Sequence, residues 1–182
     1  MSQRYGPPEV VRVVADAPVP GVGADDLLVR VHATTVNRTD CAYRGAHPFV
    51  MRGMTGLRRP RVEVWGTEYA GVVERVGREV TRFAPGDEVF GYAEGQFGAH
   101  AELVAVGATS LVAPVPHGVD FASAAAATEG AHYALSSIRR AGVRPGQRVL
   151  VHGATGAIGS AAVMLLADLG ARVTATAPSA HV

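Results

Sequence analysis

The sequence has a single cysteine and no secretory leader pattern. Cys41 has no partner for an internal disulfide, which is typical of a protein kept in a reducing compartment. The first residues, Met1 to Tyr5, lack the basic segment followed by an apolar one that a secretory signal carries. We therefore expect a cytoplasmic protein.

Net charge and long apolar runs are also nearly absent. Lys+Arg 17 against Asp+Glu 16 gives a formal net charge of +1, too small a field to drive binding to nucleic acid. No apolar stretch reaches the ~18 residues of a membrane helix, because Asp168 interrupts the most apolar helix and Glu129 interrupts the alanine run. With 48% apolar residues, the chain predicts a globular protein whose partner is a small molecule.

Residues that bind metals are scattered. Zn²⁺ needs three or four nitrogen, sulfur or oxygen ligands in a tight tetrahedron, whereas the seven histidines show no paired spacing and cysteine occurs once. We therefore expect no metal site, and we expect Cys41 to be a small buried or half-buried residue.

Glycine supplies the strongest motif that is present, in the stretch 148–162. Val149 to Val151 predict a short buried strand, and apolar residues recur at helical spacing from Ala161 to Leu169. Glycines between strand and helix are typical of a loop that binds a pyrophosphate: Gly156 allows the backbone to approach it, and Gly159 allows close packing of the helix. The expected cofactor-binding residues of this loop are Ala154, Thr155, Gly156, Ala157, Ile158 and Gly159.

The glycine motif is weak when taken alone. Ala154 replaces the first glycine of the usual pattern, so the prediction depends on the strand before the motif and the helix after it. A P-loop is excluded, because Gly159 is followed directly by Ser160 with no lysine between them. A purely structural glycine turn is the alternative.

The rest of the chain falls into two parts. Residues 1–118 alternate β-like runs with turns, which is typical of a barrel or sandwich. From Asp120, which can cap a helix, the sequence becomes alanine-rich and helical. We expect an α/β protein with a β domain over 1–118, then a helical joint and the start of a nucleotide-binding domain over 119–182. The expected strands are Val10–Ala15, Leu27–Val36, Tyr69–Val76, Asp87–Tyr92 and Ala99–Val106.

An arginine-rich segment, His47–Val62, interrupts the β domain. Gly53, Gly56 and Pro60 predict a long loop without regular structure. Two interpretations stay open. Charge runs usually face water, but the arginines also suit a rim that attracts an acidic substrate or the phosphate of a carrier.

Three motifs in order carry a family resemblance: GTEYAGVV at Gly66–Val73, RFAPGDEVFG at Arg82–Gly91, and VRPGQRVLVHGATG at Val143–Gly156. Together they resemble the medium-chain dehydrogenase/reductase superfamily, in its zinc-free quinone oxidoreductase branch. The resemblance implies a GroES-like β barrel followed by a Rossmann fold. Since few residues follow Gly159, we expect only the first β-α-β unit of that fold, in a chain truncated within the Rossmann domain.

The resemblance also implies which residues act. In zinc-containing members, cysteine and histidine ligands stand at the positions of Asn37 and Thr67, so this chain implies zinc-independent chemistry. Hydrogen-bond donors must then polarise the substrate carbonyl during hydride transfer. The implied catalytic residues are Asn37 and Tyr43, and Asn37 and Thr128 are implied to lie near the nicotinamide. The alternatives are a turn residue bonded to local backbone for Asn37 and a plain helix junction for Thr128.

The choice of cofactor depends on the end of the second Rossmann strand. An Asp or Glu about 20 residues beyond the glycines binds the free ribose hydroxyl of NADH, and here no acid follows Asp168. Ser179 matches a serine that the family often has at this place. We expect NADPH to be preferred over NADH.

The implied activity is reduction of a quinone, an enone or another α,β-unsaturated carbonyl compound by NADPH, in an enzyme that is a homodimer when complete. Two alternatives stay open: a truncated non-catalytic fragment that serves interaction only, and an alcohol dehydrogenase-type activity. The 182-residue chain alone is expected to fold its β domain but to show no significant turnover.

Overall fold

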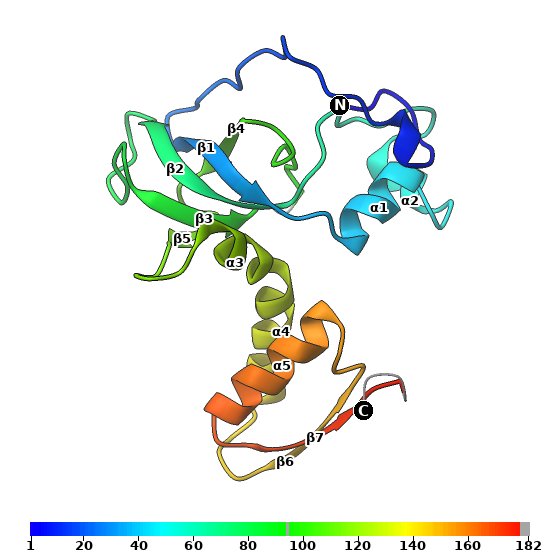
Figure 1. Ribbon diagram of the computed structural model, residues 1–182, viewed down its shortest axis with the longest axis vertical. Coiled ribbons are helices and arrows are strands. Elements are labelled where there is room, and N and C mark those ends of the chain that lie inside the picture. The colour runs from blue at the N-terminus through cyan, green and yellow to red at the C-terminus, as the bar shows by residue number, and fades with distance from the viewer. Residues whose placement is uncertain (94, 179–182) are drawn as a thin grey trace. The chain divides into compact units, whose positions relative to one another are not determined.

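The computed structural model describes residues 1–93 and 95–178. The chain divides into two compact units, Met1–Ala125 and Ala126–Val182 (Figure 1). The division lies within helix α3 (Phe121–Ala126), and the expected domain boundary between residues 118 and 119 stays a prediction. No helix of the described residues is long and apolar enough to cross a membrane.

A curled antiparallel sheet forms most of the first unit (Figure 1). Its five strands lie in the order β4-β1-β2-β3-β5, and every neighbouring pair is antiparallel. The sheet is a half-barrel, so the predicted α/β protein with a curled β fold at its N-terminus is confirmed. The strands are β1 (Asp26–Thr34), β2 (Glu68–Val76), β3 (Glu88–Tyr92), β4 (Leu103–Gly107) and β5 (Leu111–Pro114).

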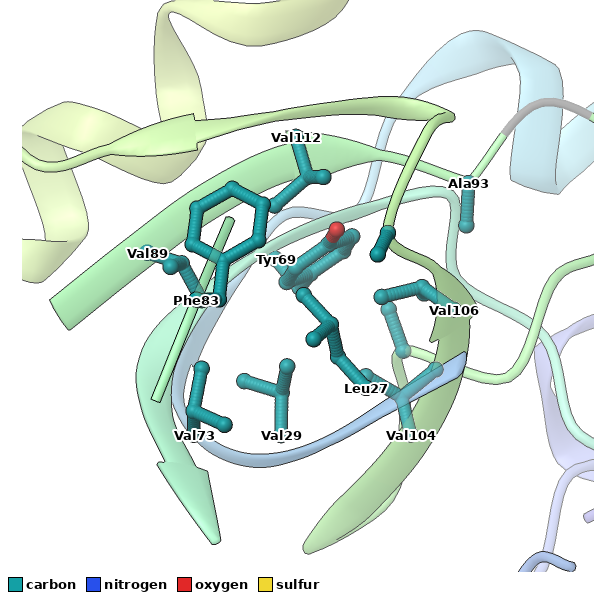
Figure 2. Packing of buried hydrophobic residues seen from close by; sticks show 12 residues of the cluster. Leu27, Val29, Tyr69, Val73, Phe83, Val89, Ala93, Val104, Val106 and Val112 are labelled. Atoms are coloured by element: carbon teal, nitrogen blue, oxygen red, sulfur yellow. The ribbon is translucent and has the colours of Figure 1, made fainter. Parts of the chain in front are cut away.

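Apolar side chains inside the curl of the sheet form the core (Figure 2). Leu27 and Val29 of β1 are fully buried and pack in one cluster with Tyr69 and Val73 of β2. Because successive side chains of a strand point to opposite faces, Arg30 faces outward. The same cluster includes Phe83, Val89, Ala93, Ala99, Val104, Val106, Ala108 and Val112.

Two predictions for the first unit are wrong. The run Val10–Ala15 forms no strand: its first residue belongs to the 3-10 helix η1 (Pro8–Val10), and Val13 is fully exposed, so its β-branched residues bury no face against the sheet. The segment His47–Val62 is not free of regular structure, because it contains the short helix α2 (Met51–Thr55). No side chain caps this helix, so the usual start signal is missing from the sequence.

Strand boundaries differ from expectation at the end of the sheet. The fifth expected strand begins at Leu103 rather than Ala99, and β5 was not predicted. A strand of four residues that ends in proline is too short to show an alternating pattern. Its pairing with β3 nevertheless places Val112 in the core.

The second unit contains a β-α-β arrangement. Strands β6 (Arg148–His152) and β7 (Arg172–Thr176) pair in parallel and are joined by α5 (Ala157–Asp168). Helix α4 (Thr128–Ala141) packs against α5. At Gly130 an added Cβ would lie 2.7 Å from the Ala157 carbonyl oxygen, so glycine is what allows the two helices to approach.

Tyr69→Phe is expected to stabilise the protein. The Tyr69 side chain is fully buried, and its hydroxyl has no hydrogen-bond partner among the described residues. An unpaired buried polar group costs about 1–3 kcal/mol, so removing the hydroxyl should raise the free energy of unfolding by about 1 kcal/mol in urea titrations. Tyr5→Phe is the control: its hydroxyl contacts Thr55 Oγ1 and the Gly56 carbonyl at 2.7 Å, so its loss should destabilise. A Tyr69→Phe protein no more stable than wild type contradicts the expectation.

Candidate functional site

A glycine loop joins β6 to α5 in the second unit. The chain turns at Gly153, whose φ of 74° is a left-handed value that favours glycine. The Ala154 N–H donates to the Thr176 carbonyl of β7 at 3.0 Å, which fixes the loop to the end of the sheet. A Cβ at Gly159 would lie 2.2 Å from the Gly153 carbonyl oxygen. Only glycine therefore lets α5 start this close to the loop, for the reason that the motif predicts.

Gly156 lies in a different environment. An added Cβ would have the Gly153 carbonyl oxygen as its nearest neighbour, at 3.5 Å, which is an ordinary contact. The residue is the N-cap of α5 with an extended backbone, φ −79° and ψ 164°. No contact within the protein thus requires glycine here. A ligand that approaches the backbone closely would require it.

The first turn of α5 offers hydrogen-bond donors. Its first internal bond runs from the Ser160 N–H to the Gly156 carbonyl at 2.8 Å, and no side chain caps the helix. The preceding N–H groups, those of Ala157, Ile158 and Gly159, have no acceptor among the described residues. The loop and first turn contain the expected residues Ala154 to Gly159, and their geometry can hold an anionic diphosphate.

The carboxyl ends of β6 and β7 lie beside this loop. His152 and Thr176, the last residues of the two strands, are paired in register, and His152 Nδ1 lies 2.8 Å from Thr176 Oγ1. In a parallel sheet, ligands bind at this end of the strands. No acidic residue occurs from Leu169 to Pro178. Ser179, the other residue expected near the ribose, lies outside the described residues.

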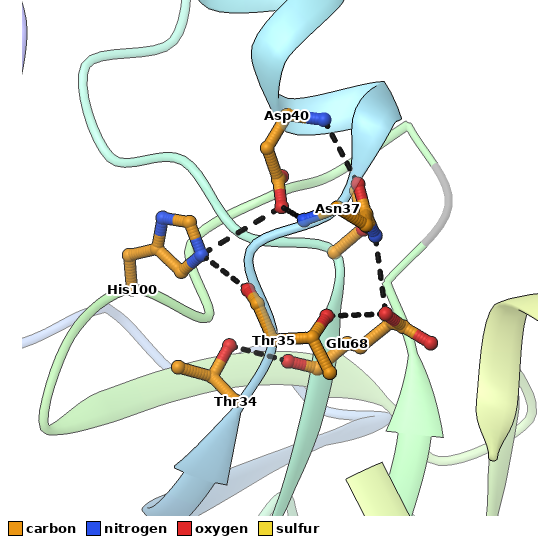
Figure 3. Close-up of polar contacts among 7 residues, drawn as sticks. Thr34, Thr35, Asn37, Asp40, Glu68 and His100 are labelled. Atoms are coloured by element: carbon orange, nitrogen blue, oxygen red, sulfur yellow. Dashed lines mark hydrogen bonds and ion pairs between the residues drawn. The ribbon is translucent and has the colours of Figure 1, made fainter. Parts of the chain in front are cut away.

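A second polar cluster surrounds the start of α1 (Arg38–Gly45) in the first unit (Figure 3). Asn37 is the N-cap: its Oδ1 accepts the Asp40 N–H at 2.9 Å, and Asp40 Oδ2 accepts the Asn37 N–H at 3.1 Å. This reciprocal capping box fixes where the helix begins. The local backbone contact considered as the alternative for Asn37 is therefore present.

The Asn37 side chain also contacts β2 and the residue before it. Its Nδ2 donates to Thr67 Oγ1 and to Glu68 Oε2, both at 3.1 Å, and the Thr35 hydroxyl donates to the same Glu68 oxygen. Glu68 is only 4% exposed, and a buried carboxylate needs such donors. Because an amide nitrogen carries two N–H groups, both are engaged in this geometry.

His100 and Asp40 complete the cluster (Figure 3). His100 Nε2 lies 2.7 Å from the Thr35 carbonyl oxygen and 3.7 Å from Asp40 Oδ2. Burial raises the pKa of Asp40, while the Asn37 N–H and the His100 ring favour the ionised form. The Asp40 Oδ1 atom is buried without a partner among the described residues.

Asp40→Asn is expected to stabilise the protein at neutral pH. Because the pKa of folded Asp40 lies above its ordinary value of 3.8, the folded state binds more protons than the unfolded state between these values. Stability is therefore lost as pH rises through that window and the buried carboxyl ionises. Asparagine keeps an oxygen that can accept the Asn37 N–H and removes the charge. Urea unfolding should show that the variant has a higher free energy of unfolding than wild type at pH 7, and that this difference disappears below the pH window. A variant less stable than wild type at pH 7 would show that His100 needs the Asp40 charge.

Tyr43 and Thr128 are the other expected site residues. The Tyr43 ring, on α1, packs edge-on against Phe97, with ring centroids 4.6 Å apart, and Phe97 in turn contacts Trp65 at 5.8 Å. The fold thus places Asn37 at the start of the short helix that carries Tyr43. Thr128 is the first residue of α4, in the second unit, and is buried. The catalytic and cofactor-binding roles of these residues stay predictions.

Sequence reasoning missed the other members of the polar cluster around Asn37. Glu68, Thr35 and His100 come from three separate segments, so no local spacing brings them together. The available signal was Glu68 itself, a charged residue at the start of a buried strand, because such residues are almost never buried unpaired.

Metal-binding side chains do not gather in the described part of the chain, where no group of three or more His, Cys, Asp or Glu could hold an ion. Cys41 is exposed rather than buried or half-buried, which corrects the expectation. It lies on α1, a helix whose mean hydropathy is low and whose buried residue is Asp40, so its small apolar side chain is not needed for packing.

The alcohol dehydrogenase GroES-like domain family matches residues 23–117, more than half of the chain. The chain belongs to this family. It is a medium-chain dehydrogenase/reductase of the quinone oxidoreductase-like kind, as the three sequence motifs predicted.

Relatives of this medium-chain dehydrogenase/reductase include both synthases and free enzymes. It is 43% identical over 176 residues to erythronolide synthase EryA2 of Saccharopolyspora erythraea, covering 92% of this chain and 4% of that protein. It is 33% identical over 177 residues to the quinone oxidoreductase of Rattus norvegicus, covering 96% of this chain and 51% of that one. The chain therefore spans about half the length of the curated quinone oxidoreductase that it matches.

Solved structures agree. The quinone oxidoreductase of Escherichia coli complexed with NADPH matches with a TM-score of 0.79 and 26% identity, over 99% of this chain and 52% of that chain. The fold predicted from the sequence motifs is thus confirmed over nearly the whole of this chain.

Proposed function

We propose that this chain supplies the substrate domain and the pyrophosphate loop of a zinc-independent reductase that uses NADPH to reduce α,β-unsaturated carbonyl compounds. The glycine loop carries the proposal. Gly159 is required by the packing of α5, whereas Gly156 is not required by any protein contact. A glycine that the fold does not need, next to free N–H donors, is what close approach of a diphosphate needs.

Several observations support NADPH over NADH. No acid lies between Leu169 and Pro178 to repel a 2′-phosphate, and His152 lies at the carboxyl end of β6. The E. coli relative was solved with NADPH. A preference for NADPH is therefore part of the proposal.

Zinc independence is supported by the contact between Asn37 and Thr67. These positions match two zinc ligands of zinc-containing members, and here their side chains hydrogen-bond to one another at 3.1 Å. An amide donor and a hydroxyl do not replace a thiolate and an imidazole as zinc ligands. The same positions thus supply a hydrogen-bonded pair instead of a metal site.

Bound NADPH would supply the hydride, and the chain's own residues would orient and polarise the substrate. Asn37 is the proposed donor to the substrate carbonyl, which requires its Nδ2 to release either Thr67 or Glu68. Tyr43, whose ring packs against Phe97, is the proposed wall of the substrate pocket. A hydrogen bond aimed at the developing enolate oxygen lowers the barrier to hydride addition at the β-carbon.

The relatives suggest two substrate classes for one reaction. Identity to erythronolide synthase EryA2 is 43%, against 33% to the rat quinone oxidoreductase. An α,β-unsaturated thioester and a quinone both accept hydride at a carbon conjugated to a carbonyl. The same site therefore suits either compound, in an enzyme that we propose to be a cytoplasmic homodimer when complete.

The test uses the full-length protein, purified without a metal-affinity tag. NADPH oxidation should be saturable with benzoquinone or with a crotonyl thioester, and NADPH should bind at least about tenfold more tightly than NADH. Elemental analysis should find far less than one zinc per chain. Turnover only with an alcohol and NADP⁺ would favour the alcohol dehydrogenase alternative, and cofactor binding without any turnover would favour the non-catalytic one.

A further inference from the structure

The arginine-rich segment has no role in the proposed reaction. Arg52, Arg58, Arg59 and Arg61 fall within it and Arg44 lies just before it, whereas no acidic residue occurs between Asp40 and Glu63. All 17 cationic residues of the chain are arginines, so the use of arginine rather than lysine is not special to this segment. What distinguishes the segment is how many positive charges it holds. The segment therefore concentrates positive charge on a protein whose net charge is only +1.

The segment has a defined conformation. The Gly56 N–H donates to the Arg52 carbonyl at 3.0 Å, and the Arg61 N–H donates to the Thr55 carbonyl at 2.8 Å. The Tyr5 hydroxyl, from the N-terminal segment, donates to the Gly56 carbonyl at 2.7 Å. These contacts hold the loop after α2 closed, so its side chains are presented from a fixed backbone.

The arginines of this segment are not neutralised by the fold. The ion pairs found among the described residues join Arg30 to Glu74, Arg78 to Glu79 and His100 to Asp40. Arg58, Arg59 and Arg61 are exposed and take part in none of them. Their charge is thus available to a partner.

Large apolar side chains are exposed on the same segment. Phe49, Val50 and Leu57 are 72%, 76% and 73% exposed, and the Arg52 guanidinium stacks 5.1 Å from the Phe49 ring. Aromatic and arginine side chains together are typical of protein interfaces. The arginine surface is defined here as Phe49, Val50, Arg52, Leu57, Arg58, Arg59 and Arg61.

We propose that the arginine surface docks an acidic partner protein, one that presents carboxylates around an apolar patch. Carboxylates complement the unpaired guanidinium groups, which bind them in a bidentate fork, and the apolar patch covers Phe49, Val50 and Leu57. A free phosphate would leave those three side chains in water. A symmetric second copy would place two arginine surfaces against each other, which like charges oppose.

A lipid surface fits the arginine surface less well than a protein does. Peripheral membrane binding usually uses a long amphipathic helix, whereas α2 has five residues. On the arginine surface, Phe49 and Val50 precede α2, and Leu57 lies on the closed loop that follows it. This surface therefore resembles a rigid protein interface more than a membrane anchor.

The test measures binding of two synthetic probes to the full-length protein. One is a fluorescent helical peptide with Glu residues flanking a Leu stripe, and the other is a peptide of the same charge and length without Leu. The Leu-containing peptide should bind more tightly, and Arg58→Glu with Arg59→Glu should weaken its binding at least about tenfold. Phe49→Ser with Leu57→Ser should abolish the preference between the peptides.

The matched control is Arg75→Glu with Arg78→Glu, which makes the same change of charge at exposed positions of the same unit. This control should change peptide binding by less than about twofold, and thermal melting should show that all variants fold. Equal losses in both charge-reversal variants would overturn the proposal, because general charge would then explain binding. So would failure of the Leu-containing peptide to bind, or binding to phosphatidylserine vesicles that this peptide does not compete for.

Discussion

Replacing Gly156 by valine should abolish NADPH binding in the full-length protein and leave its stability nearly unchanged. The extended backbone of Gly156 accepts a β-branched residue, and an added Cβ meets the protein only at 3.5 Å. The valine methyl groups would instead fill the space in which a diphosphate approaches the loop. We expect at least about a 100-fold rise in the dissociation constant, or roughly 2.7 kcal/mol.

Gly159→Val is the matched comparison. Its Cβ would lie 2.2 Å from the Gly153 carbonyl oxygen, a backbone atom that no side-chain rotation can move away. The start of α5 must then shift, which costs several kcal/mol of stability together with cofactor binding. Fluorescence titration with NADPH and thermal melting separate the two variants. If Gly156→Val destabilised the fold as much as Gly159→Val, or bound NADPH normally, then the loop would be structural only.

Motifs that act through their own backbone were predictable from the sequence. The glycine loop, strand β6 and helix α5 follow from adjacent residues, because a turn, a strand and a helix start leave local signals. Asp120 was also predicted as a cap, and the Ser123 N–H donates to its Oδ1 at 2.9 Å. The family resemblance added the β fold of the first unit, which short strands alone did not fix.

Features that depend on pairing in space were not predictable. Val10–Ala15 has the composition of a strand, but the sequence cannot say that no neighbouring strand pairs with it. Conversely, Leu111–Pro114 is a strand because β3 offers it an edge. The environment of Glu68 likewise depends on residues more than thirty positions away, such as Thr35, which precedes it by 33 positions in the sequence.

The two ends of the Asn37 side-chain amide make different contacts. Its Oδ1 caps α1, while its Nδ2 binds the buried Glu68 and Thr67. A catalytic Asn37 must therefore be held by one end of its amide and act with the other. Glu68 keeps that amide oriented, with the nitrogen facing β2.

Asn37→Ala should lower the free energy of unfolding by about 2–4 kcal/mol. Loss of an N-cap costs about 1 kcal/mol, and loss of a hydrogen bond to a charged, buried carboxylate costs about 1.5–3 kcal/mol. Asn37→Ser should recover only the first of these, because its hydroxyl can accept the Asp40 N–H but does not reach Glu68. Urea unfolding of the two variants therefore separates the cap from the contact with the carboxylate. If Asn37→Ser were as stable as wild type, Glu68 would not depend on Asn37.

Asn37→Asp tests the same contact through pH. Aspartate is as good an N-cap as asparagine, but it places a second carboxylate about 3 Å from Glu68, where two negative charges cannot both be accommodated. The folded pair then binds a proton that the unfolded chain releases, so the variant should be much less stable than wild type at pH 7 and should recover as pH falls toward the ordinary carboxyl range. Wild type and Asn37→Ser lack this added pair, so they should show only the recovery that comes from Asp40, whose pKa burial raises. If Asn37→Asp were as stable as wild type at pH 7, the Asn37 amide would not face Glu68 in solution. The proposal that Glu68 orients Asn37 for catalysis would then be wrong.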